Sequence, residues 1–336
     1  MKKIMCLVLA KLLFCGVIGA TAAEPLAPAT PTLVRQGKMV QPPKIDGRIE
    51  RDEWLSASSF FGGRSGVNGL MTNRYCVYYF GYDADNLFFA YRSEAPISPI
   101  VLSTDDTVEI QLLPPGTTTA MRLTLNSFGD NNFPEGTKFA NSFITSTRPY
   151  GYPCWEAEIA IPLASIGAKV EDGREWGLQM LRNWCNPRET GYWHFPAKPG
   201  ELGTFIPDAL APAVGVPDFG EYVHWRTSAN YTLNFTAFNP SEKQVRVTSE
   251  GMAYIASGTA KLDSDLESNT EISKKNIPAS MAPDPGKAAY ATHLVYNLWP
   301  GKINLLKFHF VDANKKMLYQ RDMAWDLSKG NNWKDE

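Results

Sequence analysis

Short runs of alternating apolar and polar residues, separated by turn-forming residues, constrain the fold of this chain most strongly. Such alternation is typical of β-strands, because successive side chains of a strand point to opposite faces. Only residues 48–57 and 162–166 favour short helices. The predicted strands form two sets: Tyr75 to Tyr82, Leu87 to Tyr91, Thr107 to Leu113, Met121 to Asn126, Trp155 to Ile161, Trp176 to Asn183 and Glu221 to Trp225, and then Tyr231 to Phe238, Gln244 to Thr248, His293 to Tyr296, Lys302 to Val311 and Leu318 to Trp325.

The two sets predict an all-β protein with two tandem β-sandwich domains. The first sandwich spans residues 44–226, and the second, with an immunoglobulin-like pattern, spans residues 227–336. Each set contains enough alternating strand to close its own core. A fragment that ends near Trp225 is therefore predicted to fold alone. The Pro-rich residues 24–43 predict an extended leader ahead of the first sandwich.

Residues 1–23 have the pattern of a secretory signal peptide. Lys2 and Lys3 precede an apolar run, and small residues follow it up to Ala23. The run is too short and too interrupted to span a bilayer. The sequence therefore predicts a secreted or periplasmic protein without membrane insertion.

Three cysteines remain after this segment, namely Cys76, Cys154 and Cys185. No pair has the Cys-x-x-Cys spacing of a zinc site. The alternation around Cys76 favours a small buried core residue, and whether a disulfide forms is left open.

Charge and aromatic content indicate the class of partner. The formal net charge is -2 and no block of basic residues occurs, which argues against nucleic acid and anionic membranes as partners. Aromatic residues make up 12% of the chain and include nine tryptophans. Aromatic faces bind the flat apolar sides of sugars and bases, so a neutral ligand such as an oligo- or polysaccharide is favoured.

Six motifs in order give the first predicted sandwich a resemblance. They are Lys44-Ile45-Asp46-Gly47 with Asp52-Glu53-Trp54, Val77 to Asp83 with Asn86 to Ala90, Asp105 to Ile110, Trp155 to Pro162, Trp176-Gly177 with Arg182-Asn183, and Asp218-Phe219-Gly220. Together they resemble the family 9 carbohydrate-binding modules. The resemblance implies a β-sandwich that binds sugar ends between aromatic side chains, often with structural calcium, beside polysaccharide-degrading enzymes such as glycoside hydrolases.

The predicted sugar site lies in residues 182–194, where aromatic and polar side chains are concentrated. Turn-forming residues there predict a loop or loop edge, in which an exposed tryptophan would need a ligand. The other reading is that both tryptophans cover one end of the sandwich core. Arg92, at the end of another strand, is a further candidate. The predicted carbohydrate-binding residues are Trp184, Trp193, Arg182, Asn183, Tyr192 and Arg92.

A structural calcium ion is the possible cofactor. Calcium requires six to eight oxygen ligands, and loops and strand ends of the first sandwich offer several carboxylates. The candidate ligands are Asp46, Asp83, Asp105 and Asp106. The alternative is that these residues form turns and stabilise loops.

Other functions have weaker support in the sequence. Glu156 and Glu158 share one face of a strand and are interpreted as solvated, so no acid–base pair is identified and an enzyme is not predicted. A structural or adhesion sandwich without sugar binding stays open. A haem-binding sandwich of a secreted electron carrier, using Met121, Met180 or His194, is less favoured because their spacing has no signature.

Overall fold

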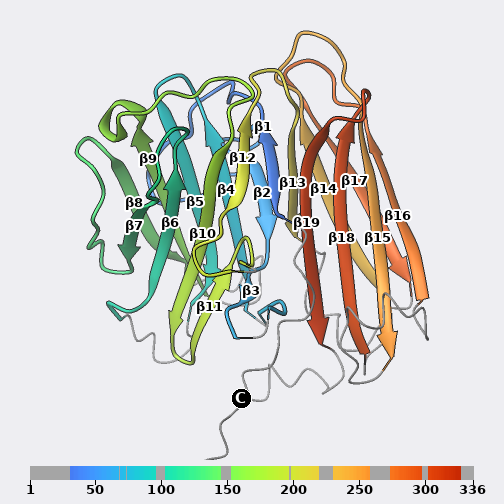
Figure 1. The fold of residues 1–336 in the computed structure, drawn as a ribbon, viewed down its shortest axis with the longest axis horizontal. Helices are drawn as coiled ribbons and strands as arrows, with labels where there is room; N and C mark the ends of the chain where they lie inside the picture. Colours follow the sequence, from blue (N-terminus) through green and yellow to red (C-terminus); the bar gives the residue numbers. More distant parts are fainter. Residues whose placement is uncertain are drawn as a thin grey trace, which may run out of the picture.

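The structure is a computed structural model that describes residues 31–67, 69–72, 74–95, 103–144, 153–196, 198–218, 230–257, 273–296 and 302–326. Two large β-sheets pack face to face, which confirms the predicted all-β sandwich (Figure 1). The first has the order β16(Ser273–Met281)-β15(Val247–Ser257)-β18(Lys302–Asp312)-β19(Met317–Asp326)-β1(Leu33–Gln36)-β12(Gly203–Pro207)-β10(Trp176–Cys185)-β11(Arg188–Tyr192)-β3(Arg64–Ser65), with β6(Thr107–Leu113) on β10 and β7(Met121–Asn126) on β6. The second has the order β17(Ala288–Tyr296)-β14(Asn230–Phe238)-β13(Ala213–Asp218)-β2(Ser58–Phe61)-β4(Cys76–Tyr82)-β5(Asn86–Glu94)-β9(Cys154–Pro162)-β8(Lys138–Ile144).

Both sheets continue across the expected domain boundary at residue 226. Strands β14 to β19 extend the two sheets of the first half, and they lie beside it in Figure 1. This arrangement corrects the expectation of a separate immunoglobulin-like sandwich over residues 227–336. The predicted strand from Glu221 to Trp225 lies outside the described residues.

The predicted leader contains a strand at the centre of this junction. Strand β1 pairs parallel with β12 and antiparallel with β19, so Val34 is opposite Phe205 on one side and Tyr319 on the other. Residues 33–36 are therefore part of the sheet, which corrects the extended leader. Residues 1–30, including the predicted signal peptide, lie outside the described part of the chain.

One large hydrophobic cluster spans both halves. Phe60 on β2 stacks on Tyr319 on β19, with ring centroids 5.5 Å apart and planes at 11°. Phe235 on β14 makes edge contacts with Phe308 and Phe310 on β18. These aromatic residues belong to one buried cluster. Aromatic pairs of this kind contribute about 0.5–1.5 kcal/mol beyond their buried area.

Arg321 on β19 ties the C-terminal strands to the first half. Its side chain is fully buried and donates hydrogen bonds to the carbonyl oxygens of Trp193 at 3.0 Å and Phe61 at 2.6 Å, and also to that of Gly62. Buried polar groups need such partners, because a lost hydrogen bond leaves desolvated atoms unpaired. The guanidinium therefore holds two segments of the first half, residues 61–62 and Trp193, against β19.

The helical expectations hold only in part. Residues 51–56 form turns without a helix, and residues 163–166 form the short 3-10 helix η1(Leu163–Ile166). Among the described residues, no helix has the length and apolar character needed to cross a membrane. Cys76, Cys154 and Cys185 are free thiols, and Cys76 is fully buried as predicted.

Candidate functional site

The predicted tryptophan platform is not exposed. Trp184 and Trp193 have only 1% and 0% of their surfaces accessible. Trp184 lies on β10, where the alternation that starts at Trp176 continues and directs its ring to the inner face. Trp193 follows β11 and packs 5.3 Å from the ring of Phe60. Neither ring has a face available to a sugar, which corrects the expectation of a loop with stacking residues.

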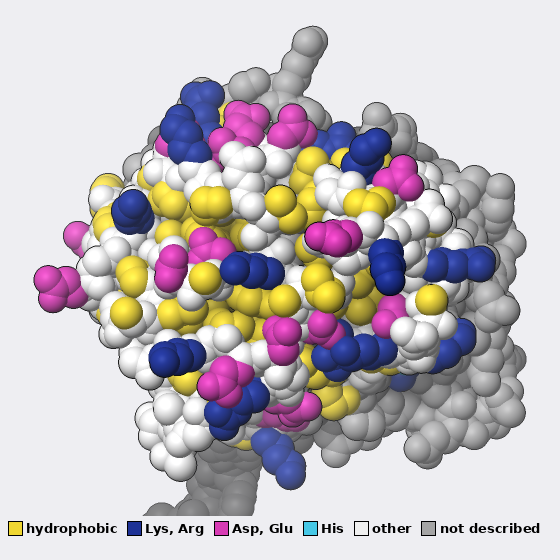
Figure 2. Space-filling model, turned by 90° about the horizontal axis from the view of Figure 1, so that it is seen from above, with side chains coloured by type: hydrophobic (Ala, Val, Ile, Leu, Met, Phe, Trp, Pro, Cys, Tyr) yellow, Lys and Arg dark blue, Asp and Glu magenta, His cyan; other side chains and the backbone are white. Residues whose placement is uncertain are grey.

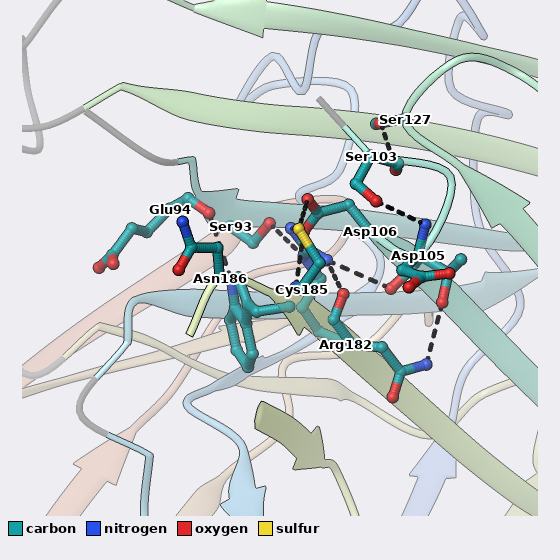
Figure 3. Close-up of polar contacts among 12 residues, drawn as sticks. Ser93, Glu94, Ser103, Asp105, Asp106, Ser127, Arg182, Cys185 and Asn186 are labelled. Carbon is teal, nitrogen blue, oxygen red and sulfur yellow. Dashed lines mark hydrogen bonds and ion pairs between the residues drawn. The ribbon is translucent and has the colours of Figure 1, made fainter. Parts of the chain in front are cut away.

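The predicted Arg182 is buried in a polar network at the end of the core (Figure 3). Its guanidinium carbon lies 4.8 Å from the ring of Trp155 and 5.1 Å from that of Trp184. It donates to Asp106 at 3.0 Å and to the Ser93 hydroxyl at 2.9 Å. Burial lowers the pKa of Arg182, and the charge of Asp106 opposes this effect. These contacts compensate the buried charge of Arg182, so this side chain is part of the core.

The remaining predicted sugar residues lie in two places. Asn183 and Tyr192 are half-buried on the hairpin formed by β10 and β11, and Asn183 bonds Thr107 and Thr190. Arg92 lies on β5, facing the outer side of the eight-stranded sheet, beside a cleft. The structure therefore separates Arg92 from the hairpin and does not assemble the predicted set.

The four candidate calcium ligands make separate local contacts. Asp46 pairs with Lys44 at 2.6 Å, Asp105 with Arg188 at 3.1 Å, and Asp106 with Arg182. Asp83 caps its own turn by accepting from the backbone N–H groups of residues 85 and 86. In the described part of the chain, no three His, Cys, Asp or Glu side chains are grouped as metal ligands.

Calcium binding stays a prediction, and thermal unfolding tests it. If the chain has a calcium site, an excess of calcium raises the melting temperature, because a ligand of the native state stabilises it by mass action. An excess of 100-fold over the dissociation constant would add about 2.7 kcal/mol to the free energy of unfolding. Melting curves in calcium, in magnesium and in chelator check this prediction. Coincident curves would contradict calcium binding.

An aromatic cleft of about 450 Å³ lies on the outer face of the eight-stranded sheet. Its floor is formed by β2, β4, β5, β14 and β17, and one wall is the segment before β2. It therefore needs strands from both sides of residue 226. The lining residues are Ile49, Arg51, Trp54, Leu55, Ala57, Ser59, Tyr75, Tyr79, Arg92, Asn234, Phe235, Thr236, Tyr290, Ala291 and Thr292.

Two buried glutamates on β9 hold the wall of the cleft in place. Glu158 accepts hydrogen bonds from the Trp54 indole at 2.8 Å and from the backbone N–H groups of Asp46 and Gly47 at 3.0 and 2.9 Å. Glu156 accepts from the Ile49 N–H at 3.0 Å and also pairs with Arg92. The segment covers both carboxylates, which corrects their interpretation as a solvated face.

Burial also affects the pKa of the Glu158 carboxyl group. Its pKa is raised by burial, and the hydrogen bonds from Trp54, Asp46 and Gly47 oppose this effect. Because every oxygen of the carboxylate is used by the wall, Glu158 positions the loop and does not face the cleft.

Two tyrosines give the cleft its aromatic surfaces. Tyr79 on β4 is half-buried, with its ring centroid 5.8 Å from that of Trp54. Tyr290 on β17 is 51% exposed, and the guanidinium carbon of Arg51 lies 4.6 Å from its ring centroid. The two strands lie on either side of β2, β13 and β14, so the rings flank the floor.

Hydroxyl and amide groups line the floor between the rings. The Thr292 hydroxyl donates to the Asn234 side-chain oxygen at 3.0 Å across β17 and β14. Gly215 on β13 lies between Ser59 and Thr236, and a Cβ at this position would come within 2.2 Å of the Ser59 hydroxyl and 2.5 Å of that of Thr236. Glycine therefore allows both hydroxyls to approach above the strand.

Sequence reasoning missed most of this cleft. The strands around Tyr79 and Tyr290 do not alternate cleanly, since Val77, Gly81, Ala288 and Leu294 share their parity, so no local pattern marks either ring as outward. Their proximity depends on the pairing of β2, β13 and β14, which has no local signature. Trp54 is buried and also contributes to the wall.

The residues considered for haem do not form a site. Met180 is fully buried in the common core. His194 is buried with its Nδ1 3.2 Å from the Thr32 hydroxyl, and burial lowers its pKa to about 4. Met121 lies at the start of β7, packed against the core.

Comparison of the sequence with protein-family models gives no match, and comparison with the curated proteins gives none either. Among solved structures, the chain is similar to a family 9 carbohydrate-binding module from Caldicellulosiruptor kristjanssonii in complex with cellotriose, at 15% identity and a TM-score of 0.38, over 53% of this chain and 95% of that one. The same module in complex with glucose gives 16% identity and a TM-score of 0.38, over 53% and 96%. A putative carbohydrate-binding protein from Bacteroides uniformis gives 13% identity and a TM-score of 0.38, over 54% and 100%. The sequence motifs resemble this same family.

Proposed function

We propose that this protein binds a saccharide in the cleft on the outer face of the eight-stranded sheet. The observation that carries the proposal is that Tyr79 and Tyr290 flank a floor of hydroxyl and amide groups from Ser59, Asn234 and Thr292. A sugar ring has an apolar C–H face and a rim of hydroxyls, so its recognition needs both kinds of group. The motifs that resemble family 9 carbohydrate-binding modules support the same function.

The ligand is proposed to be the end of a chain, bound without chemical change. The segment before β2 closes one side of the cleft, which favours a terminal sugar over an internal one. Glycoside hydrolysis commonly uses two carboxylates that flank the scissile bond. The lining of this cleft contains no Asp or Glu, so a binding role is favoured over catalysis.

The cellular setting extends this proposal. The predicted signal peptide supports a secreted or periplasmic protein, and the family resemblance supports a role accessory to polysaccharide degradation, beside a glycoside hydrolase. The location and the accessory role are expectations from the sequence, and the proposed binding in the cleft does not depend on either.

Replacing Tyr290 with alanine tests the site. We expect Tyr290→Ala to weaken saccharide binding by roughly five- to thirtyfold, because a lost aromatic contact costs about 1–2 kcal/mol. The ring is half-exposed, so the melting temperature should change little. Affinity is measured by calorimetry against ligands identified on a glycan array.

Phe128→Ala is the matched control, since Phe128 is 57% exposed and lies outside the cleft lining. It should keep the affinity of the unmodified protein. A Tyr290→Ala variant with unchanged affinity would place the sugar elsewhere, and an unmodified protein that binds nothing on the array would contradict the function itself.

A further inference from the structure

The cleft carries positive charge on a protein that is otherwise slightly acidic. Its lining includes Arg51 and Arg92 but no Asp or Glu, whereas the whole chain has a formal net charge of -2. On the face drawn in Figure 2, by comparison, basic and acidic side chains are interspersed. The charge of the lining is therefore a local property with consequences for the ligand.

The charge of Arg92 is already balanced within the protein. Its guanidinium pairs with the buried carboxylate of Glu156 and donates to the Ile49 carbonyl oxygen at 2.7 Å. These contacts join β5 and β9 to the wall. Arg92 thus holds the cleft in shape and contributes little net charge to it.

Arg51 is the other cation of the lining, and its sequence neighbours Glu50 and Asp52 are not among the lining residues. It is exposed on the turn before β2, and none of the ion pairs found among the described residues includes it. Its described contact is with the ring of Tyr290, 4.6 Å away. An aromatic face attracts a cation but neither neutralises it nor replaces a carboxylate as acceptor. The N–H donors of Arg51 are therefore available beside the ring where we place the sugar.

We propose that the saccharide bound in this cleft carries a carboxylate, as uronic acids do, and that Arg51 receives this group next to Tyr290. This inference rests on the proposed function and specifies its ligand. A planar guanidinium forms two parallel hydrogen bonds with a carboxylate, a geometry that a lysine or a neutral amide does not offer. The contact with Tyr290 restricts the side chain of Arg51 and so reduces the entropy lost when the acid binds.

The test uses a glycan array with neutral, uronate-containing and sulfated oligosaccharides, followed by calorimetry. For each uronate ligand, the free acid is compared with its methyl ester, which removes the charge and keeps the sugar. We expect the acid to bind about five- to thirtyfold more tightly than the ester, with a smaller ratio at high salt because the site is open to solvent. Arg51→Gln should reduce this ratio to about one, chiefly by weakening the binding of the acid.

Arg48→Gln is the control, because Arg48 is exposed on the same segment but does not line the cleft. It should keep the preference for the acid. Neutral or sulfated sugars that bind as well as the uronates, or a preference that survives in Arg51→Gln, would overturn the inference and leave saccharide binding intact. If no glycan of any class binds, the proposed function fails first and this inference fails with it.

Discussion

A fragment that ends at Trp225 is expected to lack a cooperative unfolding transition. Removing residues 226–336 deletes β19, the antiparallel neighbour of β1, together with β14 and β18. The cut exposes Phe60, which is fully buried and stacks on Tyr319 in the whole chain. It also leaves open edges on β1 and β13, and exposed edges of this kind promote aggregation. Circular dichroism melting and gel filtration of the fragment check this expectation.

A point variant separates this effect from a change in chain length. Arg321→Met keeps most of the side-chain volume but removes the donors to the carbonyl oxygens of Trp193, Phe61 and Gly62. A buried acceptor without its partner costs about 1–3 kcal/mol, so three of them are enough to unfold a marginally stable protein.

Lys243→Met is the matched control, since Lys243 is exposed in a turn. It should keep the melting temperature of the unmodified chain. A fragment that melts sharply as a monomer, together with a stable Arg321→Met variant, would restore the two independent sandwiches that the sequence predicts.

Local strand signals located some strands accurately and missed others, such as β8 and β16. The runs Thr107 to Leu113 and Met121 to Asn126 match β6 and β7 residue for residue. These strands are adjacent in the sequence and pair with each other, so alternation and turn chemistry suffice to define them. Strand β1 was missed because its four residues are surrounded by prolines and become a strand only by pairing with β12 and β19.

The same limit explains the errors at the candidate site. Alternation correctly directs Glu156 and Glu158 away from the core, but it cannot show that residues 46–54 fold back over them. The cleft likewise joins Tyr79 and Tyr290 through strands that are distant in the sequence. Such pairings follow from packing of the whole chain, which a window of neighbouring residues does not contain.

The sequence of β10 does contain a signal that distinguishes a tryptophan of the core from one exposed to a ligand. Residues 176, 178, 180, 182 and 184 have the same parity, so a strand that continues past Asn183 directs all of them inward. Reading the segment as a loop broke this pattern. The turn begins only after Cys185, beyond the last tryptophan of the strand.

Trp184→Ala and Trp193→Ala are therefore expected to lower the free energy of unfolding and to leave the proposed saccharide cleft chemically intact. Truncation of a buried tryptophan typically costs about 3–5 kcal/mol. For Trp184 the loss also removes the ring that Arg74 and Arg182 contact at 5.4 and 5.1 Å, so a buried charge loses part of its packing. Urea denaturation measures both variants, with the slope of the transition compared to detect any change in the unfolded state.

Trp155→Ala and Phe128→Ala are the controls for a large and a small loss of free energy of unfolding. Trp155 is 1% exposed and should behave like the two buried tryptophans, whereas Phe128 is exposed and its variant should stay within about 0.5 kcal/mol of the unmodified protein. Affinity is measured on the same samples at a temperature where each is folded. If Trp184→Ala or Trp193→Ala retains its stability and loses saccharide binding, the hairpin is the platform after all, and Tyr290→Ala should then have no effect on affinity. The two sets of variants thus give opposite results under the two assignments, because a ring cannot both fill the core and present its face to a ligand.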